Sequence, residues 1–200
     1  MADLLPDQLR LMAEHHADEI GFTNVATDES LTFAEWDRAS NRLARWLVAQ
    51  GVAKGDRVAL LIPPEEPDRF LVAYAAVHKA GAAAVPTSTR LVARELGFVL
   101  AHAGATVALT GTSTLPALLA ARPDLPELRT VVTTGVIPSD EPGAGRVVAW
   151  DDATADDDSP FQVPVDGSDL ADVMYTSGTT GQPKGVVVRH GNIAMIPNGL

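Results

Sequence analysis

The sequence has no cysteine, and this absence excludes several chemistries at once. Without thiols the chain can form no disulfide framework, no thiolate metal site and no cysteine nucleophile. The chain also lacks an excess of basic residues, because 15 Lys and Arg face 26 Asp and Glu, for a net charge of −11. This charge argues against nucleic acid and against anionic membrane surfaces as partners, since both attract basic patches.

The N-terminus lacks the signals that direct a chain out of the cytoplasm. Its first residues contain no basic region and no long apolar run, so neither a signal peptide nor a membrane span is predicted. A cytoplasmic location is the default expectation. There are no internal repeats. With 46% hydrophobic and 20% charged residues, the 200-residue chain is long enough for one or two globular domains with a buried core.

A regular alternation of apolar strands and amphipathic helices begins at Arg57. The pattern predicts strands at 58–62, 82–85, 105–110 and 130–134, and helices at 67–80, 92–103 and 115–121. The strands are continuous apolar runs, as a sheet buried on both faces requires. Strand, helix and strand at these spacings predict right-handed βαβ units. The predicted fold class is therefore α/β, a parallel βαβ sheet with flanking helices.

The opening segment, residues 1–62, has a different pattern. It predicts a helix at 6–17, strands at 20–25 and 31–33, and then a second long helix. Thr32 and Glu35 fit a capping box that begins this second helix, and Gly51 ends it. These residues are structural by their chemistry, and we assign none of them to a site.

The stretch from Tyr175 to Gly185 is rich in glycine and hydroxyl residues and contains one lysine. Glycines let backbone N–H groups face a ligand, hydroxyls donate to phosphate oxygens, and lysine supplies a mobile charge. The spacing is not that of a Walker A loop, because Pro183 stands where that pattern needs glycine. Its flanks, 170–175 and 186–188, are predicted to be short buried strands. A flexible hairpin connection is the alternative that composition leaves open.

The order of these residues favours the phosphate-loop interpretation. Tyr-Thr-Ser-Gly-Thr-Thr-Gly-Gln-Pro-Lys-Gly-Val, followed by Arg189-His190-Gly191-Asn192, closely resembles the phosphate-binding signature of the adenylate-forming superfamily. Leu-Thr-Phe-Ala-Glu at 31–35 and the segment 51–58 also resemble the start of that superfamily. The resemblance covers nearly all of the chain. It implies that the fold is an incomplete large N-terminal domain of an adenylate-forming enzyme.

The resemblance implies an activity, with roles for particular residues. The complete enzyme would use ATP to activate a carboxylic acid as an acyl-adenylate and would then form a thioester with CoA. Its cofactors would be ATP, Mg²⁺ and CoA, and its partners small molecules. Lys184 would be catalytic and would neutralise charge on the leaving pyrophosphate. The nucleotide-binding residues would be Thr176, Ser177, Gly178, Thr179, Thr180, Gly181 and Lys184. No residue is assigned to a metal.

Two alternatives remain open at this point. The chain could be an amino-acid adenylation domain of a peptide synthetase, although the Thr-Arg-Leu-x-x-x-Glu-Leu pattern at 89–96 looks more like the acyl-CoA ligase branch. Ser88 departs from that branch, which usually has asparagine there. The chain could also be a non-catalytic nucleotide-binding fragment, since the sequence ends 15 residues after Gly185. We therefore expect residues 1–200 alone to lack turnover.

The chain is expected to divide into four parts. These are the opening segment 1–62, a βαβ subdomain at 63–150, an acidic linker at 151–160, and the phosphate-loop hairpin with the start of the next helix at 161–200. The linker, with its five aspartates, is predicted to be solvated and partly disordered. Pro197 makes the last helical turn doubtful. If the polypeptide ends at Leu200, strand edges within 20–62 should be exposed, and either homo-oligomers or disorder are expected there.

Overall fold

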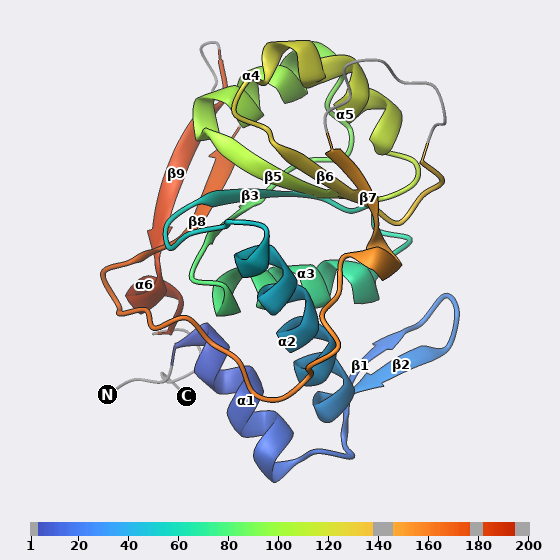
Figure 1. Ribbon diagram of the computed structural model, residues 1–200, viewed down its shortest axis with the longest axis vertical. Helices are drawn as coiled ribbons and strands as arrows, with labels where there is room; N and C mark the ends of the chain where they lie inside the picture. Colours follow the sequence, from blue (N-terminus) through green and yellow to red (C-terminus); the bar gives the residue numbers. More distant parts are fainter. Residues whose placement is uncertain (1–3, 138–145, 177–181, 195–200) are drawn as a thin grey trace.

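The computed structural model of the chain describes residues 4–137, 146–176 and 182–194 (Figure 1). The helices in these ranges are α1 (Leu5–His15), α2 (Phe33–Ala49), α3 (Pro67–Lys79), α4 (Ala93–Ala103), α5 (Leu115–Ala121) and α6 (His190–Ala194), with 3-10 turns at Arg122–Asp124 and Trp150–Asp152. The strands are β1 (Ile20–Asn24), β2 (Glu29–Thr32), β3 (Arg57–Leu61), β4 (Ala83–Pro86), β5 (Ala105–Thr110), β6 (Thr130–Thr133), β7 (Arg146–Ala149), β8 (Leu170–Thr176) and β9 (Lys184–Arg189).

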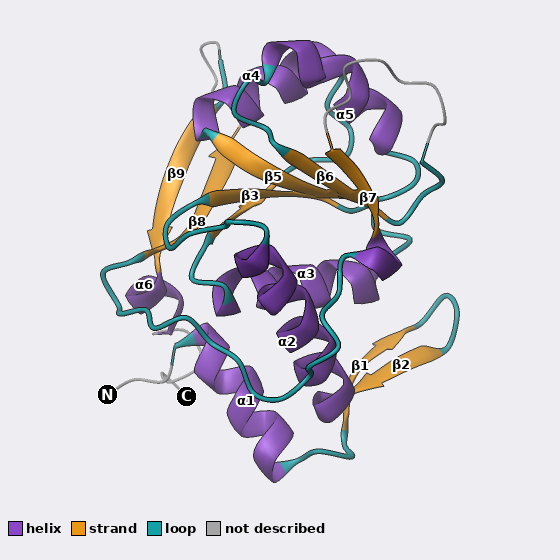
Figure 2. Ribbon diagram, viewed as in Figure 1, coloured by secondary structure: helices purple, strands orange, loops and turns teal. Residues whose placement is uncertain are grey.

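A seven-stranded sheet forms the centre of the molecule, with strand order β7-β6-β5-β3-β4-β8-β9. All neighbouring strands are parallel except β8 and β9, which form an antiparallel pair at one edge. Figure 2 shows α4 and α5 on one face of this sheet and α3 and α2 on the other. The predicted α/β fold, with a mostly parallel sheet and flanking helices, is confirmed.

Each face of the sheet has its own hydrophobic core, and β3 contributes to both. Val58 and Leu60 pack with α2 and α3, whereas the alternating residues Ala59 and Leu61 pack with α4 and α5. All four side chains are almost completely buried. Successive side chains of a strand point to opposite faces, so a strand covered on both sides must be apolar at every position. This explains the continuous apolar runs of the sequence.

The predicted helix ends agree with the structure to within one or two residues. At the start of α2 the Thr32 hydroxyl accepts a hydrogen bond from the Glu35 amide, and the Glu35 carboxylate accepts one from the Thr32 amide. These two bonds satisfy donors that have no partner within the helix. At the end of α4, Gly104 has φ +65°, a left-handed conformation that glycine adopts without steric cost.

Two features differ from the sequence-based expectations. Strand β7 was not predicted, because its four residues form a strand only through parallel pairing with β6. The five aspartates of the acidic segment 151–160 are exposed, as expected, but Ala153 is buried and the prediction that the segment is partly disordered is wrong. Asn41, Arg42 and Arg45 of α2 donate to the backbone carbonyls of Ala155, Asp158 and Ser159 and to others in this segment. The division of the chain into four parts stays a prediction.

Candidate phosphate-binding site

The candidate site is built on the antiparallel hairpin of β8 and β9, at one edge of the sheet (Figure 1). The β-branched and aromatic residues in both strands favour extended structure. In the register of the hairpin, Tyr175 pairs with Gly185 and Thr176 pairs with Lys184. The hairpin therefore places the first and last predicted binding residues opposite each other. Ser177, Gly178, Thr179, Thr180 and Gly181 lie outside the described residues.

The two strands of the hairpin differ in burial, which corrects one expectation. Ala171 to Val173 of β8 are buried, as predicted, but β9 is not. Val186 is 47% and Val187 58% exposed. The valines of β9 are exposed because β9 is the edge strand of the sheet, and among the described residues it pairs only with β8. Apolar residues in an edge strand cannot be assigned to the core from sequence pattern alone.

Thr176 and Lys184 have properties that suit an anionic ligand. Both side chains are exposed. Lys184 forms no ion pair with any carboxylate in the part of the chain that the structure describes, so its ammonium group is available to a phosphate. A free lysine beside a hydroxyl residue fits a polyphosphate. The rest of the predicted ligand set cannot be placed, because it falls in 177–181.

Tyr175 fixes the strand that leads into the loop. Its hydroxyl lies 2.7 Å from His102 Nδ1 on α4, and burial raises the pKa of Tyr175. Gly185 makes room for the ring, since a Cβ at this position would lie 3.3 Å from ring atom Cζ of Tyr175 and 3.3 Å from Val173 Cγ1. The glycine of the signature thus has a packing role, because it lets the tyrosine ring lie over the opposite strand.

The opposite face of β8 carries a buried polar cluster that sequence reasoning did not identify. The Tyr74 hydroxyl donates to Asp172 Oδ2 at 2.9 Å, and His78 Nε2 lies 3.2 Å from Asp172 Oδ1. The ring of His190 packs edge-on against His78, with 5.4 Å between ring centroids. We call Tyr74, His78, Asp172 and His190 the polar cluster. The signal in the sequence was an aspartate inside an apolar strand.

His190 is completely buried, and neither ring nitrogen has a hydrogen-bond partner among the described residues. Burial lowers the pKa of His190 to about 4, and the neighbouring His78 contributes in the same direction. The ring is therefore neutral near pH 7. His190 begins α6 immediately after β9, so the polar cluster contacts the chain on both sides of the loop.

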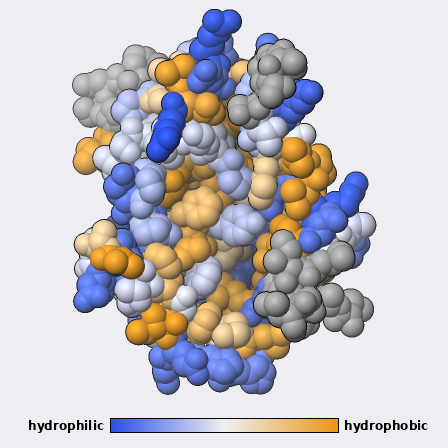
Figure 3. All heavy atoms as spheres, turned by 180° about the vertical axis from the view of Figure 1, so that it is seen from behind, coloured by the Kyte–Doolittle hydropathy of each residue, from blue (hydrophilic) through white to orange (hydrophobic). Residues whose placement is uncertain are grey.

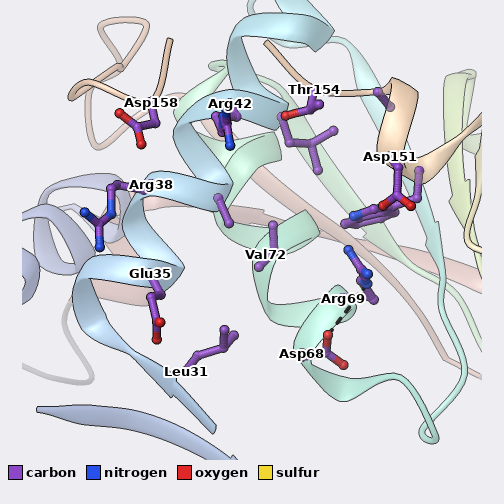
Figure 4. A pocket seen from close by; sticks show the side chains of 14 residues that line it. Leu31, Glu35, Arg38, Arg42, Asp68, Arg69, Val72, Asp151, Thr154 and Asp158 are labelled. Atoms are coloured by element: carbon purple, nitrogen blue, oxygen red, sulfur yellow. Dashed lines mark ion pairs between the residues drawn. The ribbon is translucent and has the colours of Figure 1, made fainter. Parts of the chain in front are cut away.

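A separate cavity of about 560 Å³ lies between α2, α3 and residues 150–158. Figure 4 shows side chains of both signs around it, with Arg38 and Arg42 from α2 and Asp68 and Arg69 from α3. None of its lining residues comes from β8 or β9. The cavity does not belong to the candidate phosphate-binding site, and its mixed charges do not converge on one ligand chemistry.

No helix in 4–137, 146–176 or 182–194 is long and apolar enough to cross a membrane. Within the same residues, no group of three or more histidines and carboxylates is arranged to hold a metal ion.

Comparison with known proteins identifies the class. The family model described as AMP-binding enzyme matches residues 9–196. The chain belongs to the AMP-binding enzyme family. It is 37% identical over 172 residues to the long-chain-fatty-acid–CoA ligase FadD13 of Mycobacterium tuberculosis (strain ATCC 25618 / H37Rv), which covers 86% of this chain and 32% of that protein. It is 32% identical over 180 residues to the nonribosomal peptide synthetase NPS2 of Ceriporiopsis subvermispora (strain B), covering 90% of this chain and 6% of that protein.

A solved structure supports the same assignment. The inhibitor-bound crystal structure of the N-terminal domain of FACL13 from Mycobacterium tuberculosis matches with a TM-score of 0.75 and 33% identity. The match covers 94% of this chain and 44% of that one. The chain thus corresponds to an N-terminal portion of the fold and spans about a third of the length of the ligase named above.

Proposed function

We propose that this chain is the N-terminal portion of an acyl-CoA ligase. The complete enzyme would activate a carboxylic acid with ATP as an acyl-adenylate, release pyrophosphate, and transfer the acyl group to CoA. One observation carries the proposal, namely the unbroken signature from Tyr175 to Gly185 on a hairpin that sets Thr176 opposite Lys184. The similarity to acyl-CoA ligases over most of the chain supports it.

In this proposal the hairpin binds the triphosphate of ATP. Lys184, which has no carboxylate partner among the described residues, would offset the negative charge that develops on the leaving pyrophosphate. Thr176, Ser177, Thr179 and Thr180 would donate hydrogen bonds to phosphate oxygens, and Gly178 and Gly181 would allow close approach. The net charge of −11 repels ATP as a whole, so the local charge of Lys184 carries extra weight.

The test is Lys184→Ala in the longer polypeptide. Removing one preorganised charge or donor typically lowers the rate by roughly 10²- to 10³-fold, and we expect ATP–pyrophosphate exchange to fall by this order without loss of folding. A panel of carboxylic acids would identify the substrate in the same assay. Arg90→Ala is a matched control, because Arg90 is an exposed loop cation outside the hairpin. Unchanged exchange in Lys184→Ala would refute the role.

The second candidate is an amino-acid adenylation domain, because the chain is also similar to a peptide synthetase. Its first step would be the same, and the acceptor would be a carrier protein instead of CoA. Exchange that depends on an amino acid, with no thioester formed on free CoA, would favour this candidate. We rank the acyl-CoA ligase first because of the Thr-Arg-Leu pattern at 89–91.

The 200 residues alone are proposed to have no turnover, since they span about a third of the related ligase. A non-catalytic nucleotide-binding role is the remaining alternative. MgATP binding by the 200-residue chain, together with absent exchange activity in the longer polypeptide, would favour that role.

A further inference from the structure

Very little strand pairing connects the phosphate-loop hairpin, residues 170–189, to the parallel sheet. β8 pairs with β9 at six positions, but it pairs with β4 at one position only, Ala84 with Asp172. Thr176 lies four positions after Asp172, which is roughly 13 Å along an extended strand. The position of the loop relative to the rest of the molecule therefore depends on how side chains hold β8, at Asp172 on one face and at Tyr175, through His102, on the other.

The side chain of Asp172 is held from α3 at this same position. Tyr74 and His78 lie four residues apart, so they face the same side of the helix. The Tyr74 hydroxyl donates to one carboxylate oxygen at 2.9 Å, and His78 Nε2 reaches the other at 3.2 Å. The same nitrogen lies 3.2 Å from the carbonyl oxygen of Ala171. Since a carbonyl can only accept, Nε2 must carry the proton.

Because the Asp172 carboxylate is buried, its hydrogen bonds to Tyr74 and His78 must keep good geometry. Asp172 is 0% exposed and His78 is 1% exposed. A carboxylate removed from water requires hydrogen-bond partners with good geometry, so β8 cannot slide along α3 without leaving the charge unsatisfied. Burial, together with the negative charge of Asp172, raises the pKa of Tyr74, and the hydroxyl keeps the proton that it donates. An apolar residue at 172 would tolerate small shifts that the carboxylate does not.

We propose that Asp172 is a positioning residue for the phosphate loop. Tyr74 and His78 hold its carboxylate, and this attachment sets the position of the hairpin relative to the parallel sheet. Asp172 itself does not contact the nucleotide in this proposal. The expected effect on MgATP binding rests on the proposed function. The attachment of β8 to α3 through Tyr74 and His78 does not.

The attachment is tested by amide hydrogen exchange of the 200-residue chain. The variants are Asp172→Asn, which keeps the shape of the side chain, and the milder Tyr74→Phe, which removes one hydroxyl. Because a lost hydrogen bond shifts local opening by about fivefold or more, we expect the amides of β8 and β9 to exchange at least that much faster. The amides of β5 and β6 should be unaffected.

Ser40→Ala is the matched control. Its buried hydroxyl donates to the carbonyl oxygen of Asp37 at 2.8 Å within α2, so this variant also removes one buried hydrogen bond. It should leave the exchange of β8 and β9 unchanged. Equal acceleration in all strands of Tyr74→Phe, or no acceleration in β9, would overturn the proposal.

A second readout is equilibrium binding of MgATP to the same chain. Both variants are expected to weaken binding at least threefold, whereas Ser40→Ala should not. Faster exchange in β9 with unchanged MgATP affinity would overturn the positioning role. If the unaltered chain binds no MgATP, that result counts against the proposed function, and the exchange pattern still decides whether Asp172 holds the hairpin.

Discussion

His190 is completely buried, and its ring nitrogens have no hydrogen-bond partner among the described residues. Burial and the neighbouring His78 lower its pKa from 6.5 to about 4 in the folded chain. Asp172 and Asp169 face the ring and oppose this shift, and Lys54 adds to it. The unfolded chain therefore binds a proton near pH 6 that the folded chain does not bind until about pH 4.

This difference predicts a pH-dependent stability. As pH falls from 6.5 to 4, protonation of the unfolded state should remove about 3 kcal/mol of folding free energy, at about 1.36 kcal/mol per pKa unit. Above pH 6.5 the contribution is constant. Urea unfolding of the chain and of His190→Leu at pH 7 and at pH 4.5 measures it. The variant should lose less stability on acidification, and equal losses in both proteins would contradict the assignment.

At the scale of elements, α2 and α3 are joined by a buried ion pair. Lys79 Nζ lies 2.6 Å from Asp37 Oδ1 and 2.6 Å from Asn41 Oδ1, and Lys79 is 1% exposed. Burial lowers the pKa of Lys79, and the Asp37 carboxylate opposes this shift. The pair joins the two helices that cover one face of the sheet.

Removing one member of this pair should be strongly destabilising. Lys79→Met leaves the Asp37 carboxylate buried without its cation, a change that typically costs roughly 3–5 kcal/mol. Chemical denaturation would measure the loss. The double variant Lys79→Met, Asp37→Asn removes both charges of this pair and should be more stable than the single variant. If both variants have the same stability, the pair does not act as proposed.

The contact between α4 and β8 predicts a smaller effect. Tyr175→Phe removes the hydrogen bond between the hydroxyl and His102 and should lower stability by about 1 kcal/mol. A double-mutant cycle with His102→Ala separates this bond from other changes, because the two substitutions should be less than additive. Strict additivity in urea unfolding would show that the 2.7 Å contact contributes nothing.

At the scale of the whole molecule, the open edge at β9 is a site where two chains could associate. Met174, Val186 and Val187 are exposed there, and β9 has no second strand partner among the described residues. Seen from behind, hydrophobic residues reach the surface between hydrophilic ones (Figure 3). Unpaired apolar edges template association between chains.

The exposed edge leads to a separate prediction, that the 200-residue chain associates through β9. Val187→Lys places a charge on β9, which should disfavour edge-to-edge pairing, and we expect the 200-residue chain to shift toward monomer in light scattering. Val136→Lys is the control, because Val136 is 88% exposed but lies in a loop outside the strands and outside 20–62. A monomer at all concentrations before substitution would refute the prediction.

Much of the fold follows from local pattern. The alternation of apolar runs and amphipathic segments between 57 and 134 predicted β3 to β6 and the intervening helices, because periodicity and capping are properties of neighbouring residues. The same applies to the hairpin, since its two strands are separated only by the loop. The family signature was also readable, because its residues are contiguous.

The sequence by itself therefore determined the α/β class and the helix ends, and it predicted the phosphate-loop residues. Only the tertiary structure decided the strand order, the exposure of β9 and the polar cluster. Asp172 meets Tyr74 across 98 residues and His78 across 94. Such pairs depend on how α3 packs on the sheet after folding, and this packing cannot be predicted from a local sequence pattern. A buried carboxylate is informative in sequence only as a departure from an apolar run, and its partners are chosen by packing.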